Sequence, residues 1–301
     1  MPPITVIINA GSGSFVENET ERNLRDEFKA NGLEIDLKLA KSGDEIEQFA
    51  NGAADSDCEI IVAGGGDGTI RSVAEIAARA GKIFGVLPLG TLNNFSKDLG
   101  IPPNLPDAVR IIADNHTKLI DLGEVNGLVF INNSSIGLYP RIVRHREVQQ
   151  ERLGRGKWWS ALIAVFRTLR ISPFLKVRIR LGDKSFLRKT TFIFVGNNRY
   201  EMDLYKIGWR PRLDAGKLSV YIPRRGGRLG VFQLFLKTIF GLIREEKDFE
   251  ILETDTITIE TRKKYQMVAF DGEVTTIETP LKYNIRPAAL RVILPEVSDK
   301  T

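Results

Sequence analysis

The stretch Cys58–Leu92 determines how the rest of the chain is interpreted, and its sequence is CEIIVAGGGDGTIRSVAEIAARAGKIFGVLPLGTL. It opens with the apolar run Ile60–Ala63, whose composition predicts a strand buried on both faces. Four glycines then occur within five positions: Gly64, Gly65, Gly66 and Gly68. Thr69 is expected to open a helix that ends at Gly81. Bare glycine backbone at a helix N-terminus predicts an anion site, most often for phosphate.

Asp67 lies inside this glycine loop. A carboxylate beside phosphates needs a cation between the two negative groups, so the loop implies Mg²⁺ as well as a phosphate-bearing ligand. The alternative is a tight turn between strand and helix that binds nothing. Four glycines, an acidic residue and a helix start in one place favour the ligand site.

The first third of the chain alternates strand and helix patterns. Ile4–Ile8 and Ile83–Leu87 predict strands, and Ser42 and Asn104 are expected to cap helices. Repeated units of this kind predict a mostly parallel sheet with helices on both faces.

Three loops are expected to meet at one edge of that sheet, because ligands bind beyond the carboxyl ends of parallel strands. These loops contain Asn9, the segment Gly64–Thr69, and Gly90 with Thr91. Their convergence predicts a single nucleotide site.

The pattern changes near Gly123 to short strands separated by turns. Asn126-Gly127 is typical of a two-residue hairpin. Further strands are expected at 176–181, 190–196, 217–222, 254–261, 267–270, 274–277 and 290–294. We therefore predict an α/β domain over residues 1–122 and a β-sandwich-like domain over residues 123–288.

Length and composition agree with a two-domain globular protein, because a chain of 301 residues is too long to fold around one small hydrophobic core. The single cysteine, Cys58, excludes a disulfide framework and favours a reducing compartment. The start Met1-Pro2-Pro3 runs directly into a strand pattern, so we expect no signal peptide. No apolar run reaches the length of a bilayer span. The expected location is the cytoplasm, with peripheral contact to the inner face of the membrane.

Positive charge is unevenly distributed, although the net charge is only +5. Two basic clusters fall at 141–157 and 210–228, and two helical patterns with aromatic residues follow them at 158–170 and 231–243. Basic and aromatic residues together suit an anionic membrane surface. The alternatives are a solvated face and a packed amphipathic helix.

The motif GGGDGT followed by LPLGTLNNFSKDLGI resembles the catalytic domain of the diacylglycerol kinase and sphingosine kinase family, most of all its soluble bacterial lipid kinases. A shorter GGDGT also occurs in NAD kinases and 6-phosphofructokinases, and the second motif, Gly90–Phe95, separates the lipid kinases from these. The resemblance implies an NAD-kinase/phosphofructokinase-like first domain to which the tail, about 289–301, returns. It also implies ATP with Mg²⁺ as cofactors and a lipid substrate, and we expect no nucleic-acid partner.

The resemblance further points to Asp271-Gly272-Glu273 near the end of the chain, where the family carries its catalytic base. Taken alone, Asp-Gly after an apolar strand is typical of a hairpin turn. Either carboxylate is expected to reach the cleft between the domains and accept the proton of the attacking hydroxyl. The residue pattern leaves open which of the two is the base.

Asp121 is a second candidate near the metal, because it follows a predicted strand and its surroundings are similar to a family stretch. A turn residue at the domain boundary is the alternative. Two departures from the family pattern bear on metal binding. Asn94 stands where an aspartate is usual, and Ala215 stands where a ligating carboxylate of a second-domain Mg²⁺ loop is expected. Either Asp214 substitutes there, or the metal is absent, or a nearby basic side chain takes its place.

Two other functions stay open. A small-molecule kinase of the NAD-kinase type is disfavoured by the second motif and by the basic, aromatic second domain. A nucleotide or lipid sensor without catalysis is favoured by Asn94 and Ala215, and disfavoured by Asp67, Asp271 and Glu273. The pattern predicts neither the lipid nor the oligomeric state.

Overall fold

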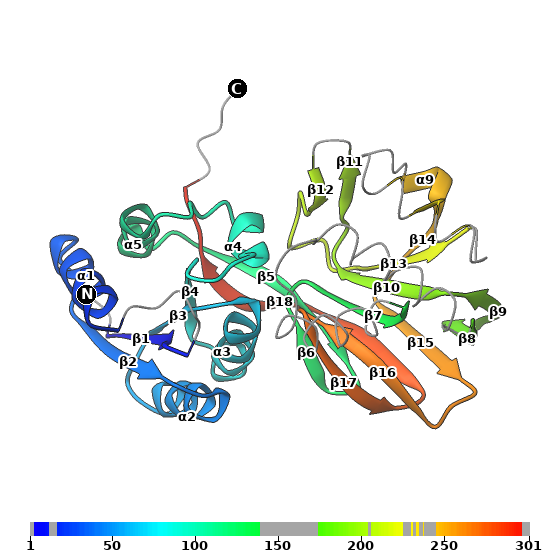
Figure 1. The fold of residues 1–301 in the computed structure, drawn as a ribbon, viewed down its shortest axis with the longest axis horizontal. Helices are drawn as coiled ribbons and strands as arrows, with labels where there is room; N and C mark the ends of the chain where they lie inside the picture. Colours follow the sequence, from blue (N-terminus) through cyan, green and yellow to red (C-terminus); the bar gives the residue numbers. More distant parts are fainter. Residues whose placement is uncertain are drawn as a thin grey trace, which may run out of the picture. The chain divides into compact units, whose positions relative to one another are not determined.

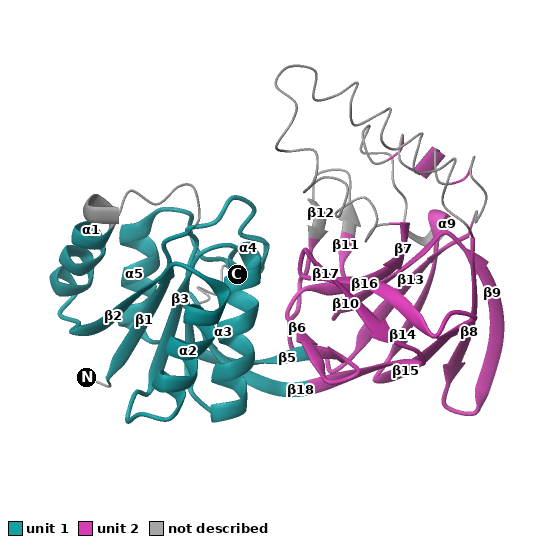
Figure 2. Cartoon of the chain, turned by 60° about the horizontal axis from the view of Figure 1, so that its bottom comes forward, with its two compact units in different colours: residues 1–122, 287–301 teal, residues 123–286 magenta. Residues whose placement is uncertain are grey.

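The computed structural model describes residues 3–11, 17–138, 174–203, 206–224, 230, 233–234, 237 and 245–296 (Figure 1). The chain forms two compact units, residues 1–122 with 287–301 and residues 123–286 (Figure 2). The basic cluster and the aromatic helix expected at 141–170 lie outside the described residues, as does most of the helix expected at 231–243.

Unit 1 contains a parallel sheet with the strand order β2-β1-β3-β4-β18. Its strands are β1 (Ile4–Asn9), β2 (Ile35–Ala40), β3 (Ile60–Gly64), β4 (Ile83–Leu87) and the end of β18 (Leu281–Ile293). Its helices are α1 (Glu17–Ala30), α2 (Gly43–Ala54), α3 (Asp67–Ala80), α4 (Asn94–Asp98) and α5 (Leu105–Asp114). Helices α1 and α5 cover one face and α2 and α3 the other (Figure 1), which confirms the predicted α/β class.

Local signals set the helix ends in unit 1. The hydroxyl of Ser42 accepts a hydrogen bond from Glu45 N, and the Asn104 side chain accepts one from Asp107 N, as expected of N-caps. Gly81 ends α3 in the left-handed conformation, with φ of +67°. The start of α3 differs from the prediction, because the helix begins at Asp67 and not at Thr69. An acidic first residue interacts favourably with the positive end of a helix, so Asp67 belongs to the first turn.

Unit 2 consists of two antiparallel sheets, which confirms the predicted sandwich-like class. The first has the order β18-β15-β8-β9, and β5 pairs with β6 and β18. Its elements are β5 (Thr117–Val125), β6 (Leu128–Phe130), β8 (Leu175–Leu181), β9 (Lys184–Thr190), β15 (Thr256–Thr261) and the start of β18.

The second sheet has the order β14-β13-β10-β7-β16-β17. Its strands are β7 (Asn133–Gly137), β10 (Phe192–Asn197), β13 (Leu218–Pro223), β14 (Phe249–Thr254), β16 (Tyr265–Phe270) and β17 (Glu273–Glu278). The short elements β11 (Glu201–Asp203), β12 (Lys206–Trp209) and α9 (Glu245–Asp248) complete the described part of the unit. Alternate side chains of the two sheets, such as Ile179, Ile259, Ile193 and Val268, form one buried apolar core.

Five of the described strands of unit 2 were not expected: β7, β9, β11, β12 and β14. The sequence of β9, KSFLRKT, is dominated by polar and basic residues, so it lacks the apolar periodicity that would predict a strand.

Every helix in the described ranges is too short or too polar to span a lipid bilayer.

Candidate functional site

The glycine loop after β3 and the loop after β4 pack against each other. A Cβ atom added to Gly90 would lie 2.6 Å from the Cα atom of Gly66 and 2.8 Å from the carbonyl oxygen of Gly65. A Cβ atom on Gly64 would lie 2.4 Å from the side chain of Ile8. These glycines are therefore required because neighbouring chain fills the space that a side chain would need.

Gly66 differs from its neighbours, because a Cβ atom added to it meets nothing within 4 Å. Its φ of −78° is accessible to any residue, so neither packing nor backbone conformation requires glycine there. Gly66 is also the N-cap of α3, and Gly68 follows in the first turn. The open space over Gly66 lies at a helix N-terminus, where an anion interacts favourably with backbone N–H groups.

Asp67 links the two loops through three hydrogen bonds. Its carboxylate accepts from the backbone N of Asn94 at 3.1 Å, from Asn94 Nδ2 at 3.2 Å and from the backbone N of Phe95 at 3.4 Å. Burial raises the pKa of the Asp67 carboxyl, and the hydrogen bonds from Phe95 and Asn94 and the charge of Lys97 oppose this effect only in part. A desolvated carboxylate in this position interacts strongly with any cation that reaches it.

Asn9, at the end of β1, ties that strand to the glycine loop. Asn9 Nδ2 donates to the hydroxyl of Thr69 at 3.0 Å, and Asn9 Oδ1 accepts from Gly11 N. Gly65 is close to both side chains, since an added Cβ atom would lie 3.0 Å from Thr69 and 3.2 Å from Asn9. The three loops predicted to converge are thus joined to one another through Asn9, Thr69 and Asp67.

Asn93 is a site residue for which the sequence analysis predicted no role. Its side chain accepts a hydrogen bond from Gly90 N and donates to the carbonyl oxygens of Pro88 and Gly90. Its backbone is left-handed, with φ of +51°, a conformation that asparagine tolerates better than most residues. Asn93 therefore shapes the turn that leaves Thr91 and Asn94 exposed at the surface.

The residues present fit Mg·ATP. Glycine backbone and the N-terminus of α3 suit the phosphates. Mg²⁺ bound to a nucleotide keeps water and phosphate oxygens as most of its ligands and needs one or two protein carboxylates, a role that Asp67 can fill. Within the described ranges, no cluster of three His, Cys, Asp or Glu side chains is arranged to hold a metal by itself.

Asp121, the second predicted metal residue, lies buried in β5. Its Oδ1 accepts a hydrogen bond from Ala288 N at 2.9 Å. Ala288 has a φ of +49°, an unfavourable conformation for alanine, and this hydrogen bond helps to hold it. The bond gives Asp121 a structural role in joining the end of the chain to unit 1, and its role as a metal ligand stays a prediction.

Asp214, the third predicted metal residue, is ion-paired. Arg212 Nε lies 3.2 Å from Asp214 Oδ1, and Ala215 N donates to Asn198 Oδ1 at 3.0 Å. The basic side chain of Arg212 thus lies beside Asp214, the carboxylate that remains in this loop, as in the alternative in which a basic side chain takes the place of the metal. The role of Asp214 as a metal ligand stays a prediction.

Asp271 and Gly272 form the two-residue turn between β16 and β17, with φ of +48° and +90°. The carboxylate of Asp271 points back into the unit, and the residue is 7% exposed. It accepts hydrogen bonds from the backbone N of Ile131 at 2.7 Å, of Asn132 at 2.8 Å and of Asn133 at 3.1 Å. Asp271 is therefore a turn residue whose carboxylate holds the segment 131–133, and its role in catalysis stays a prediction.

Glu273 follows at the start of β17 and is exposed. The two carboxylates are thus not equivalent, because the turn separates a buried group from an exposed one. This difference was not predictable from the spacing of the two residues.

Arg210 is a buried charge that the sequence analysis placed in a surface cluster, and it is 1% exposed. It donates to the carbonyl oxygens of Ile131 and Asn197 and to Asn132 Oδ1. The segment 131–133 is therefore held by Asp271 through its three N–H groups, and by Arg210 through the carbonyl oxygen of Ile131 and the side chain of Asn132. Each of these two buried charged groups is compensated by the polar atoms to which it is hydrogen-bonded.

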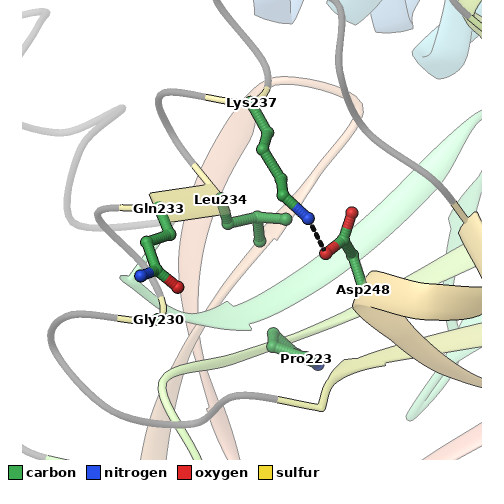
Figure 3. Close-up of a pocket in the computed structure, with 6 residues that line it drawn as sticks. All are labelled: Pro223, Gly230, Gln233, Leu234, Lys237 and Asp248. Carbon is green, nitrogen blue, oxygen red and sulfur yellow. Dashed lines mark hydrogen bonds and ion pairs between the residues drawn. The ribbon is translucent and has the colours of Figure 1, made fainter.

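A small pocket in unit 2 is lined by Pro223, Gly230, Gln233, Leu234, Lys237 and Asp248 (Figure 3). Lys237 forms an ion pair with Asp248 beside it. The cavity holds about 20 Å³, enough for a water molecule and far less than an acyl chain.

Comparison with protein families defines the class first. Residues 3–125 match the diacylglycerol kinase catalytic domain, and residues 138–294 match the YegS C-terminal NAD kinase beta sandwich-like domain. Solved structures agree in fold. A structure described as "a putative diacylglycerol kinase from Bacillus anthracis str. Sterne" covers 97% of both chains with a TM-score of 0.74 and 22% identity, which is evidence for the fold alone.

Relatives of similar length then define the family. A protein of Pseudomonas syringae pv. tomato named "Probable lipid kinase YegS-like" is 35% identical over 287 residues, which are 92% of this chain and 90% of that protein. A protein of the same name from Pseudomonas aeruginosa is 29% identical over 269 residues, 88% of this chain and 86% of the relative. The chain belongs to the YegS-like lipid kinase family, which confirms the predicted resemblance.

Proposed function

We propose that the protein uses ATP and Mg²⁺ to phosphorylate a lipid hydroxyl such as that of diacylglycerol. The observation that carries the proposal is the junction of the two glycine loops, in which Asp67 accepts from Asn94 and Phe95 and Gly90 packs on Gly66. This junction presents open glycine backbone, a helix N-terminus and a desolvated carboxylate in one place. These are the groups that phosphoryl transfer needs for a phosphate cradle and a metal.

In this proposal the residues of unit 1 bind and orient the nucleotide. The backbone around Gly66 and the first turn of α3 receive the phosphates, and Asn9 and Thr69 fix the shape of the loop. Asp67 holds the cation, which neutralises charge on the phosphates when it is bound. Asn94 supports the Asp67 carboxylate by hydrogen bonding and brings no second negative charge.

In unit 2, the proposed base is Glu273 and Asp271 is its positioning residue. Asp271 accepts three backbone hydrogen bonds, so its acceptor capacity serves the segment 131–133. Glu273 is exposed at the strand start directly after this fixed turn. It accepts the proton of the lipid hydroxyl as that oxygen attacks, a role that contributes about 10²–10⁴-fold in rate.

A second candidate is a nucleotide- or lipid-binding sensor with impaired catalysis. The Arg212–Asp214 ion pair at a loop where relatives are expected to bind a metal, together with Asn94, favours it. Sphingoid bases are further candidate acceptors. For either function we also propose peripheral contact with an anionic membrane surface.

Incubation with labelled ATP and a mixed lipid extract, followed by thin-layer separation, tests these alternatives. Label in a lipid product that depends on Mg²⁺ and disappears with Asp67→Ala supports the kinase. Nucleotide binding without any labelled lipid would favour the sensor. Label in a water-soluble nucleotide product would indicate an NAD-type substrate.

A further inference from the structure

The outer face of the sheet β18-β15-β8-β9 is basic. Strand register puts the side chains of Lys176 and Lys189 next to each other, and aligns Arg180 with Thr258 and Lys282. Their neighbours along each strand, such as Val177 and Ile179, point the other way into the buried core. Five basic side chains share this outer face and all are exposed: Lys176, Arg178, Arg180, Lys189 and Lys282.

Glu260 is the single acidic side chain that the register of these four strands places on the same face. Its carboxylate lies 2.7 Å from Arg180 Nη2 and 3.8 Å from Arg178 Nη1, so one negative charge serves two arginines. Coulomb attraction for a polyanion therefore remains over the whole face.

Leu187 lies within this basic face, opposite Arg178, and is 70% exposed. A simpler role for exposed basic residues on the edge strand β9 is to prevent pairing with another sheet. That role does not explain the basic residues on β8 and β18, which are paired on both sides. Nor does it explain a large exposed leucine on the edge strand itself.

We propose that this outer face binds the anionic surface of a lipid bilayer, with the basic side chains on headgroup phosphates and Leu187 among the upper acyl chains. Basic groups around an exposed aliphatic residue match both layers of a bilayer surface, its charged headgroups and its acyl chains. Single-stranded nucleic acid is the other polyanion to consider, but its bases stack on aromatic side chains and the centre of this face is aliphatic. The inference rests on the proposed function only for the choice of lipid as the anion.

The test is co-sedimentation of the full chain with vesicles of equal parts phosphatidylglycerol and phosphatidylcholine at low ionic strength. Each engaged basic residue contributes about fivefold to partitioning, so Lys176→Gln with Lys189→Gln should lower it about 25-fold. The matched control, Arg22→Gln with Lys29→Gln on exposed positions of α1, removes the same charge and should change partitioning less than about twofold. Melting curves establish that each variant is folded.

Leu187→Ser supplies a second, independent signature. Its effect should persist at high salt, whereas the effect of the lysine pair should shrink, because screening weakens charge interactions and leaves apolar burial intact. Equal losses for the lysine pair and its control would overturn the proposal, as would a Leu187→Ser variant that binds like the parent. Tighter binding to single-stranded DNA than to vesicles, lost with the lysine pair, would assign the face to nucleic acid instead.

Activity on a short-chain lipid dispersed below its aggregation concentration separates this inference from the kinase assignment. The lysine-pair variant should retain that activity. If the parent protein has no kinase activity and the vesicle results hold, the proposed function fails and the membrane face stands.

Discussion

Replacing Asp271 and Glu273 separately by their amides tests how the two carboxylates divide their roles. Asp271→Asn keeps the size of the side chain and also suits the backbone, because Asn-Gly is at least as good as Asp-Gly in a two-residue turn with positive φ. Any loss of stability therefore reports on the carboxylate itself. The amide group can accept from Asn132 N and Asn133 N, but its NH₂ then faces the N–H of Ile131.

The cost follows from those contacts. Loss of one hydrogen bond to a charged acceptor and the burial of an unpaired N–H group together destabilise unit 2 by about 3 kcal/mol. For a unit of this size, such a loss lowers the melting temperature by roughly 6–12 °C.

Glu273→Gln should behave differently. Glu273 is exposed, so the free energy of unfolding should change by less than about 0.5 kcal/mol. Loss of the proton acceptor should lower kcat by about 10²–10⁴-fold while ATP affinity changes little. Circular dichroism melting and steady-state turnover with lipid in micelles measure both quantities for each variant.

An Asp271→Asn protein that melts with the parent would refute the view that this carboxylate holds the segment 131–133. Near-normal turnover of Glu273→Gln would refute the assignment of the base. If both variants were normal, the Asp-Gly pair would serve only as a hairpin turn.

Three further predictions concern unit 1. Gly66→Ala should leave the melting temperature unchanged, because the added methyl group enters open space. The same space is proposed for phosphate, so ATP binding measured by calorimetry should weaken by at least about tenfold. The control is Gly52→Ala, in the exposed last turns of α2, which should leave ATP affinity intact. Gly90→Ala should instead lower stability by about 1–3 kcal/mol as well as ATP affinity, since its Cβ atom would overlap the loop at Gly66, and an unchanged melting curve would contradict the packing of the two loops. Burial raises the pKa of the Asp67 carboxyl above its ordinary 3.8, so the folded protein binds a proton at Asp67 more tightly than the unfolded chain does. The resulting stabilisation of the folded state is present below pH 3.8 and is lost as pH rises through the pKa of Asp67 in the folded protein. Carboxyl-carbon NMR titration of the nucleotide-free protein should show the raised value, and a titration at or below 3.8 would be inconsistent with a desolvated Asp67.

The sequence by itself determined the features that depend on neighbours along the chain. The strand, glycine loop and helix of 60–81 were predictable because apolar periodicity and glycine conformations are local properties. The hairpin turn at Asn126-Gly127 and the caps at Ser42 and Asn104 were predictable for the same reason. The two family motifs, GGGDGT and LPLGTLNNFSKDLGI, also made the class of protein predictable from the sequence.

Tertiary structure decided the features that join distant parts of the chain. Asp271 and Ile131 are 140 positions apart and Asp67 and Asn94 are 27 apart, so no local pattern reports that either pair is hydrogen-bonded. Arg210 looked like one member of a surface cluster until the fold surrounded it with carbonyl oxygens. The strand β9 is set by pairing with β8, and its polar sequence would not form a strand without that partner. Side-chain chemistry is therefore given by the sequence, whereas burial and partners, which fix how a carboxylate or guanidinium acts, arise only when distant segments meet.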